Sequence, residues 1–172
     1  MQSIARFEKV SLDQFTKDFA SAFPEKADNA ASIYSGILLP RRATTGSACY
    51  DFFIPFDAHI APGETLLIPS GIRVAIDPGW VLMLFPRSGL GFKYRFQLDN
   101  SVGIIDSDYW GAKNEGHIFL KMTNDTHSGK EIVLRCGEGI AQGIFVPFGI
   151  TSDDSVSDIR TGGFGSTTRK DN

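Results

Sequence analysis

The stretch TLLIPSGIRVAIDPGWVLMLF, which runs from Thr65 to Phe85, decides the fold class. It contains two apolar runs, Thr65–Ile76 and Trp80–Phe85, and the dipeptide Pro78-Gly79 separates them. Short runs of β-branched and aromatic residues bounded by Pro and Gly are typical of β-strands joined by turns. We therefore expect strands in this part of the chain.

Similar short runs continue on both sides of this stretch from Gly36 onward, with Gly, Pro, Asn and Asp between them. The other candidate strands are Ile37–Pro40, Cys49–Pro55, Val102–Ile105, His117–Thr123, Lys130–Leu134 and Ile140–Phe148. Strands at this spacing without helices between them indicate an all-β sandwich or barrel. We expect residues 36–150 to form this unit, and the polar stretch Thr151–Asp158 to lead into a flexible arm over residues 151–172.

Residues 1–35 form an extension with a different pattern. The sequence from Ser11 to Gln14 is a capping box, in which Ser11 caps a helix and Gln14 bonds back to it. Apolar residues then recur at helical spacing until Pro24 ends the run; they are Leu12, Phe15, Phe19 and Phe23. We expect an amphipathic helix that packs on the β-unit, with Lys17 and Asp18 on its solvated face.

Composition excludes several classes of partner. The 172 residues carry a formal net charge of −3, whereas proteins that bind nucleic acid present a basic surface. A free nucleotide needs only a local positive site, so this class of ligand stays open. No apolar run approaches the roughly 20 residues of a membrane span, and the N-terminus lacks the apolar stretch of a signal peptide. We expect a cytoplasmic protein without nucleic-acid or membrane partners.

The cysteines and histidines do not suggest a metal centre. Cys49 and Cys136 lie in apolar, strand-like segments, where a reduced thiol in the core is the usual arrangement. The three histidines show no clustered spacing with them, which argues against a structural zinc site.

Two segments carry groups suited to phosphate chemistry. In Pro86–Leu90, Arg87 and Ser88 can engage phosphate oxygens and Gly89 exposes a backbone N–H; a plain turn is the alternative. In Gly103–Tyr109, Asp106 emerges where the apolar pair Ile104-Ile105 ends, and it can deprotonate a water or hold a metal. A β-turn rich in Asp would look similar.

Two further features are unusual. Asp51 lies between Tyr50 and Phe52 in an apolar strand, so its carboxylate needs a partner, a metal or the solvent-facing side of the strand. The tail Arg160–Thr167 reads Arg-Thr-Gly-Gly-Phe-Gly-Ser-Thr, and combines a cation, an aromatic ring and hydroxyls with glycines that allow close approach to a ligand. This inventory suits a flap that closes over a nucleotide, and a disordered Gly/Ser tail is the alternative.

Taken together and in this order, the segments resemble the five motifs of the homotrimeric dUTP diphosphatase (dUTPase) family. The five segments are Gly46–Phe52, Pro86–Leu90, Asn100–Tyr109, Gly137–Gln142 and the glycine-rich tail. The resemblance covers about Ile37 to Thr168 and implies an all-β, dUTPase-like β-barrel or jelly roll with an N-terminal helical extension.

The resemblance also implies an activity: hydrolysis of dUTP to dUMP and pyrophosphate, with Asp106 as the general base for a water that attacks the α-phosphorus. Mg²⁺ would ride on the triphosphate, with Asp51 reaching it only indirectly through water. The partners would be dUTP and two further copies of the chain, with sites between subunits. The implied substrate-binding residues are Arg87, Ser88, Gly89, Asn100, Gly103, Ile104, Ile105, Tyr109, Gln142, Arg160, Phe164, Gly165, Ser166 and Thr167.

The sequence departs from the family pattern at four places. Gly139 stands where a basic residue is usual, and Trp110 follows Tyr109 in place of the frequent Arg or Gln. Residues 112–116 look like a small insertion, and Arg160 lies one residue closer to the glycine pair than is common. Two other functions stay open: dCTP deaminase chemistry on the same fold, although no glutamate motif for it is found, and a catalytically silent regulator that binds a partner protein.

Overall fold

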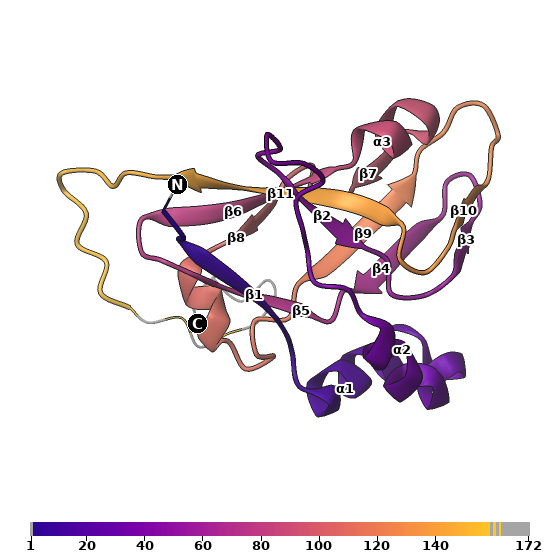
Figure 1. Cartoon of the computed structure of the whole chain (residues 1–172), viewed down its shortest axis with the longest axis horizontal. Coiled ribbons are helices and arrows are strands. Elements are labelled where there is room, and N and C mark those ends of the chain that lie inside the picture. Colours follow the sequence, from indigo (N-terminus) through magenta and orange to yellow (C-terminus); the bar gives the residue numbers. More distant parts are fainter. Residues whose placement is uncertain (1, 159, 161, 163–172) are drawn as a thin grey trace, which may run out of the picture.

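The computed structural model describes residues 2–158, 160 and 162, and it is built mainly from β-strands (Figure 1). The strands are β1 (Ala5–Lys9), β2 (Tyr50–Phe53), β3 (Ala58–Ile60), β4 (Thr65–Pro69), β5 (Ile72–Ile76), β6 (Trp80–Pro86), β7 (Phe96–Leu98), β8 (Gly103–Ile105), β9 (Phe119–Asn124), β10 (Ile132–Leu134) and β11 (Gly139–Pro147). The helices are α1 (Leu12–Ala22), α2 (Ala30–Gly36) and α3 (Ser88–Tyr94), with 3₁₀ turns η1 (Pro24–Asn29) and η2 (Ser107–Gly111). The all-β expectation is confirmed.

The described strands form separate sheets and do not close into one barrel. The largest has the order β2-β11-β6-β8, and a second has the order β4-β9-β7. β1 pairs with β5, and β3 pairs with β10. Every pairing between these strands is antiparallel, as expected for strands joined by short turns.

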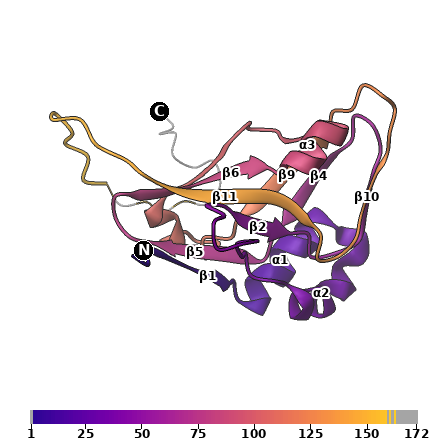
Figure 2. The same cartoon turned by 45° about the horizontal axis from the view of Figure 1, so that its top comes forward.

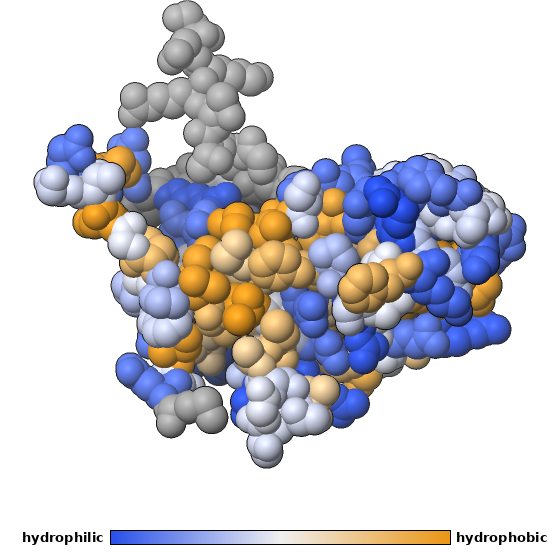
Figure 3. Space-filling model, turned by 90° about the horizontal axis from the view of Figure 1, so that it is seen from above, coloured by the Kyte–Doolittle hydropathy of each residue, from blue (hydrophilic) through white to orange (hydrophobic). Residues whose placement is uncertain are grey.

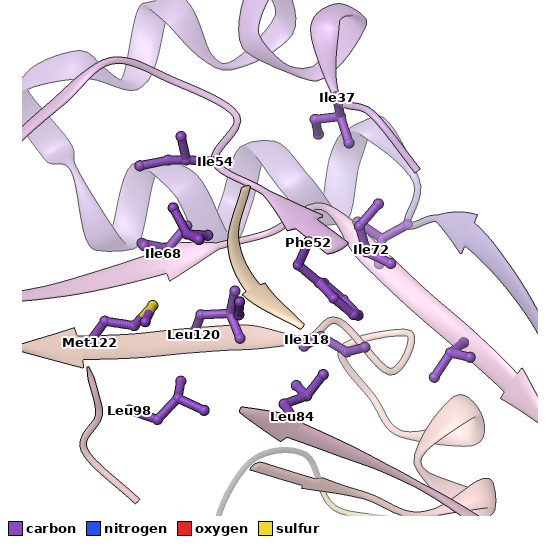
Figure 4. Close-up of a cluster of buried hydrophobic side chains, with 14 of the residues drawn as sticks. Ile37, Phe52, Ile54, Ile68, Ile72, Leu84, Leu98, Ile118, Leu120 and Met122 are labelled. Carbon is purple, nitrogen blue, oxygen red and sulfur yellow. The ribbon is translucent and has the colours of Figure 1, made fainter. Parts of the chain in front are cut away.

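The hydrophobic core lies between the two larger sheets. Figure 4 shows Phe52 and Leu84 from one sheet in the same cluster as Ile68, Leu120 and Met122 from the other. Each of these side chains is at most 1% exposed. The apolar runs that predict the strands therefore also supply the core.

The sequence Thr65–Ile76 is not one strand, because the chain changes sheet at Ser70-Gly71. β4 ends at Pro69 and pairs with β9, whereas β5 begins at Ile72 and pairs with β1. Gly71 has a φ of +73°, which side chains rarely allow, and the Ser70 hydroxyl donates to the Ile118 carbonyl at 2.6 Å. The glycine makes the corner possible, and the serine fixes it.

The N-terminal extension contains a strand that the sequence analysis missed. β1 pairs antiparallel with β5, with Ala5 opposite Ile76 and Lys9 opposite Ile72. Phe7 packs its ring against the aromatic rings of the four-stranded sheet, including Phe145 at 5.8 Å between centroids. A single aromatic residue between charged neighbours gives too little alternation to predict a strand, and only the pairing identifies it.

The predicted N-terminal helix is confirmed as α1. The Ser11 hydroxyl accepts a hydrogen bond from the Gln14 backbone N–H at 3.1 Å, and Phe15 and Phe19 are fully buried. The return bond expected from Gln14 was wrong, because the Gln14 amide donates to Asp18 at 2.8 Å instead. Figures 1 and 2 both show α1 and α2 side by side at one end of the molecule.

Several other predictions need correction. Ile37–Pro40 is not a strand. The helix α3 was not predicted, because two glycines in its seven residues hide the helix from propensity arguments. The three-residue strands β3 and β7 were missed. Cys136 is exposed and Cys49 only partly buried, so neither is the core thiol that the sequence suggested.

The corner at Gly71 leads to a testable prediction. A Cβ at this position would overlap Ile37 Cδ1, and it would lie 3.3 Å from Phe15 Cδ2. Gly63 also has a left-handed φ, of +79°, but nothing lies within 4 Å of its Cβ position. Gly63→Ala should therefore cost about 1–2 kcal/mol of unfolding free energy for the backbone alone, and Gly71→Ala about 1–3 kcal/mol more because of overpacking. Urea unfolding at a fixed protein concentration measures both, and equal costs would contradict the packing argument.

Candidate functional site

The four-stranded sheet carries the segments that the sequence analysis selected. Asp51 on β2 lies opposite Gln142 on β11, and Gln142 lies opposite Phe85 on β6. β6 then pairs with β8 on its other edge, with Leu84 opposite Gly103. The pairing of the strands thus brings segments from residues 51 to 142 into one sheet.

A cavity of about 600 Å³ lies at the end of this sheet where β6 leads into α3. It is lined by Asp51, Phe53, Arg87, Ser88, Gly89, Leu90, Gly137, Glu138 and Gly139. The structure therefore unites three of the predicted segments in one place. The Arg87 guanidinium lies 3.6 Å from the Asp51 carboxylate and its side chain is 46% exposed, so this loose pairing leaves the cation open to an anionic ligand.

Gly139 explains how Arg87 reaches this position. Gly139 is buried, and a Cβ there would lie 2.8 Å from Arg87 Nη1 and 3.2 Å from Arg87 Cζ. The absence of a side chain at 139 leaves the space that the Arg87 side chain fills on its way toward Asp51. Gly139, one of the departures from the family pattern, is thus matched by the position of the Arg87 side chain.

The groups of the Asn100–Tyr109 segment lie along and beyond β8. β8 is an edge strand, so the backbone groups that do not bond to β6 face away from the sheet. Ile104 is half exposed. The turn before it is closed by bonds from Ser101 N to Leu98 O and from Val102 N to Asn100 O, and Asn100 itself is exposed.

Asp106 follows β8 directly and precedes η2, with its side chain 54% exposed. Arg160 donates from Nη1 to the Asp106 carboxylate at 3.1 Å and to Asp108 at 3.4 Å. The same guanidinium lies 5.0 Å from the centre of the Tyr109 ring. The structure thus places Arg160 beside Asp106 and not at the cavity that holds Arg87.

Tyr109 is held from its hydroxyl end. The hydroxyl donates to the His117 carbonyl at 2.8 Å and accepts from Asn114 Nδ2 at 2.8 Å. Only 5% of Tyr109 is exposed, and this burial raises the pKa of its phenol. The phenol therefore stays protonated and works as a fixed hydrogen-bonding group.

The cavity and Asp106 lie at opposite ends of β6. Ile105, the residue before Asp106, pairs with Leu82 of β6. Arg87 lies five positions after Leu82 in the chain. At about 3.3 Å per residue this separation is about 17 Å. Figure 1 shows α3 at the upper right and the helical turn η2, which follows β8, at the lower left.

Some predicted site residues fall outside this description. Phe164, Gly165, Ser166 and Thr167 lie outside the described residues. Within residues 2–158, 160 and 162, no three His, Cys, Asp or Glu side chains come together in a group that could hold a metal ion. No helix in the described part of the chain is long and apolar enough to cross a membrane.

Sequence reasoning missed one buried polar contact. His117 is fully buried, and its Nδ1 lies 2.6 Å from the Asp18 carboxylate of α1. Asp18 was expected on the solvated face of the helix, and this expectation was wrong. Burial alone raises the pKa of Asp18, but hydrogen bonds from His117 and Gln14 outweigh it and hold the pKa below its ordinary value of 3.8.

Comparison with known proteins gives consistent matches. The sequence model of the dUTPase family matches residues 36–168. The deoxyuridine 5'-triphosphate nucleotidohydrolase of Lactococcus lactis subsp. lactis is 43% identical over 136 residues, which cover 77% of this chain and 89% of that protein.

Solved structures agree with these matches. The dUTPase of Streptococcus mutans superposes with a TM-score of 0.60 at 40% identity, covering 68% of this chain and 90% of that one. A dUTPase from phage phi11 of S. aureus gives a TM-score of 0.63 and covers 91% of this chain and 98% of that one. Its 18% identity supports the fold alone, and that protein is described as coordinating a structural Mg(II) ion.

The contact between Asp18 and His117 predicts a pH dependence of stability. The folded-state pKa of Asp18 is lowered, so its stabilising contribution is complete above the unfolded-state value and is lost as the pH falls through the folded-state pKa. Asp18→Ala should therefore destabilise the protein at pH 7, and its difference from the wild type should shrink below about pH 4. Urea unfolding over this pH range measures the difference.

Asp28→Ala is the matched control for this prediction, because Asp28 lies exposed in η1, the 3₁₀ turn that follows α1, and not in the first turn of a helix, where a carboxylate would interact with the helix dipole. It should show neither the loss at pH 7 nor the narrowing at low pH. A difference between Asp18→Ala and the wild type that stays constant down to pH 2.5 would contradict the assigned contact.

Proposed function

The chain belongs to the dUTPase family and is an enzyme that hydrolyses dUTP, and from this membership we propose that a water molecule attacks the α-phosphorus in line to give dUMP and pyrophosphate. The observation that carries the proposal is the position of Asp106, a half-exposed carboxylate at the end of an edge strand and beside Tyr109. This position supports a role for Asp106 as the general base, beside groups that would hold the nucleoside.

The outward backbone edge of β8 would read the uracil base, together with Asn100. Gly103, Ile104 and Ile105 offer N–H and C=O groups there in a fixed order. Cytosine reverses the donor and acceptor of this pairing edge, so its binding would leave polar groups unpaired at a cost of roughly 1–3 kcal/mol each. The edge strand therefore supports discrimination between the two bases.

Tyr109 would pack against the deoxyribose and leave no room for a 2′-hydroxyl. Because Tyr109 is only 5% exposed, a covering group must leave before a sugar can touch the ring. Arg160 is such a group, since it lies over the ring and comes from the C-terminal tail. On leaving, Arg160 would free Asp106 and bring a positive charge to the phosphates, the role that the sequence predicted for it.

Asp106 would take a proton from the attacking water as the bond from oxygen to the α-phosphorus forms. The bond between the α-phosphorus and the bridging oxygen breaks on the opposite side, and pyrophosphate leaves with the electron pair. General-base catalysis of this kind contributes about 10²–10⁴-fold to the rate. Most of the remaining acceleration in phosphoryl transfer comes from positioning and charge neutralisation.

The cavity around Arg87 would bind the phosphates. Arg87, Ser88 and Gly89 line it, and Gln142 lies next to Asp51 in the sheet. A guanidinium matches the geometry of two phosphate oxygens and keeps its charge at every working pH. Phe164, Ser166 and Thr167 of the tail, with Gly165 between them, would complete the closed site, Phe164 by stacking on uracil and the hydroxyls by contacting the terminal phosphates.

The residues at the cavity fit Mg²⁺ carried by the triphosphate. Mg²⁺ keeps several waters and commonly takes one or two carboxylates together with substrate phosphates, so a full set of protein ligands is not needed. Asp51 and Glu138 are the two carboxylates that line the cavity. Glu138 accepts from the Arg135 backbone N–H at 3.2 Å, whereas the distance of 3.6 Å between Asp51 and Arg87 leaves Asp51 able to accept a hydrogen bond from a bound water. The ion would neutralise charge on the triphosphate when bound.

The site would be shared between copies of the chain. Asp106 and Arg87 lie about 17 Å apart along one strand direction, too far for both to act on the same phosphate group of one nucleotide. A second copy that brings its Arg87 to the Asp106 of the first removes this difficulty, and rings of identical subunits repeat such a contact. Figure 3 shows apolar surface gathered on one face, which an assembly would bury; we propose the homotrimer.

The activity is tested by pyrophosphate release with Mg²⁺ from dUTP, dTTP, dCTP and UTP. We expect release from dUTP alone, and a loss of about 10²–10⁴-fold in kcat for Asp106→Asn, because the amide cannot accept the proton. Asp153→Asn, in the exposed stretch after β11, is the matched control and should leave the rate unchanged. Ammonia release from dCTP would instead favour dCTP deaminase activity. A lack of activity with all four nucleotides would favour a regulator that binds a partner protein.

The shared site is tested by mixing two inactive variants. Asp106→Asn keeps a working Arg87, and Arg87→Ala keeps a working Asp106. If the two groups act from different subunits, coexpression of both variants should restore about a quarter of the wild-type sites in a ring. Each variant expressed alone gives the baseline, and a mixture no more active than this baseline would mean that one chain supplies both groups.

A further inference from the structure

The loop of residues 112–117, between η2 and β9, touches Tyr109 directly. Asn114 Nδ2 donates to the Tyr109 hydroxyl, which in turn donates to the His117 carbonyl. Gly116 lies so close to η2 that a Cβ there would be 2.7 Å from the Tyr109 carbonyl oxygen and 3.0 Å from Trp110 Cα. This segment, which the family comparison left without a role, therefore holds the ring that we place against the sugar.

The same loop is attached to the N-terminal helix at Glu115. The Glu115 carboxylate accepts from the Ser11 backbone N–H at 2.7 Å and from the Ser11 hydroxyl at 2.6 Å, and these hydrogen bonds hold the pKa of Glu115 below its ordinary value. Glu115 thus takes the place in the helix cap that the sequence analysis gave to Gln14. Its φ of +58° is unusual for a residue with a side chain, and the bonds to Ser11 offset this backbone cost.

A second attachment runs through His117. The Gly71 backbone N–H donates to His117 Nε2 at 2.8 Å, so this nitrogen carries no proton. The ring is then a neutral imidazole with its proton on Nδ1, and it donates this proton to Asp18 at 2.6 Å. The buried ring of His117 thus joins α1 to the corner at Gly71. The backbone carbonyl of the same residue accepts from Tyr109.

Arg73 of β5 connects the loop to η2 from the other side. Its guanidinium stacks 3.3 Å from the centre of the Trp110 ring and donates to the Trp110 carbonyl at 3.1 Å. It also lies 4.0 Å from the Glu115 carboxylate. Trp110, which replaces the Arg or Gln more frequent in the family, is therefore part of this arrangement.

From these contacts we propose that α1 and the loop 112–117 act together as a support for Tyr109, and that Asp18, Glu115 and His117 are positioning residues for sugar recognition. The inference rests on the proposed function, since it assigns to Tyr109 the contact with deoxyribose. None of the three side chains needs to touch the nucleotide. They act by fixing the carbonyl and amide that hold the Tyr109 hydroxyl.

Loss of the support should affect recognition of the sugar more than chemistry at Asp106. η2 separates Asp106 from the loop, and in the described structure Asp106 makes no hydrogen bond to a side chain of the loop. Tyr109, in contrast, makes two hydrogen bonds with the loop. A displacement of about 1 Å can cost 10²-fold in rate, and a partly released ring should cost less. We expect the ratio of kcat/KM for dUTP to kcat/KM for UTP to fall roughly tenfold, mainly because KM changes. This ratio is the preference for dUTP.

The test measures kcat and KM for dUTP and UTP in the full chain and in Asp18→Ala and Glu115→Ala, at a temperature well below the measured Tm of each variant. Asp18→Asn and Glu115→Gln are the conservative variants, because an amide oxygen can still accept the bonds from His117 and Ser11. They should recover most of the preference for dUTP. Asp13→Ala on the exposed face of α1 is the matched control and should behave as the wild type.

A double-mutant cycle with Tyr109→Phe identifies the route. If Asp18 acts through the Tyr109 hydroxyl, Asp18→Ala should change the preference for dUTP much less in the Tyr109→Phe background than in the wild type. Full additivity of the two changes would overturn the inference, as would an unchanged preference in Asp18→Ala and Glu115→Ala. A wild-type chain that releases no pyrophosphate from dUTP would overturn the proposed function and the inference with it, so the two failures are distinguishable.

Discussion

The hydrogen bonding of β6 along both of its edges is the constraint on which the rest of the site depends. β11 pairs with one edge and β8 with the other, so the register of a single strand decides where Gln142, Gly103 and the residues after them lie. Because strands are nearly inextensible, Arg87 at the end of β6 and Asp106 beyond β8 are held apart by a fixed length. The distance on which the proposal of a shared site rests is thus a property of the sheet and not of any loop.

A fully buried, neutral histidine has a comparable role at the other end of the molecule. His117 would be costly to bury without partners, and it satisfies both ring nitrogens with groups from distant parts of the chain, the Gly71 N–H and the Asp18 carboxylate. Removal of either partner would leave a buried polar group unpaired. This requirement ties the N-terminal helix to the corner between β4 and β5, and through the His117 carbonyl to Tyr109.

Residues at which the sequence departs from the family pattern contact residues that are distant in the sequence and that fit them. Gly139 removes a side chain where Arg87 needs room. Trp110 provides a flat ring on which Arg73 stacks, and Arg73 approaches Glu115 of the inserted loop. Glu115 in turn caps a helix that lies outside the family match. Each change makes sense only beside a neighbour that is remote in the sequence.

The sequence by itself determined the class of fold, the helix that begins at Ser11 and the short segments that carry the chemistry, because apolar periodicity and motif spacing are local properties of the chain. It could not determine β1, whose five residues include a single large apolar side chain, or α3, whose glycines hide it. It also misplaced Asp18, which gave no sign of its buried partner 99 positions away. Only the tertiary structure decided which strands pair, how far apart Arg87 and Asp106 lie, and what holds Tyr109. The physical reason is that these features arise from hydrogen bonds and packing between residues distant in sequence, whose energies no local pattern records.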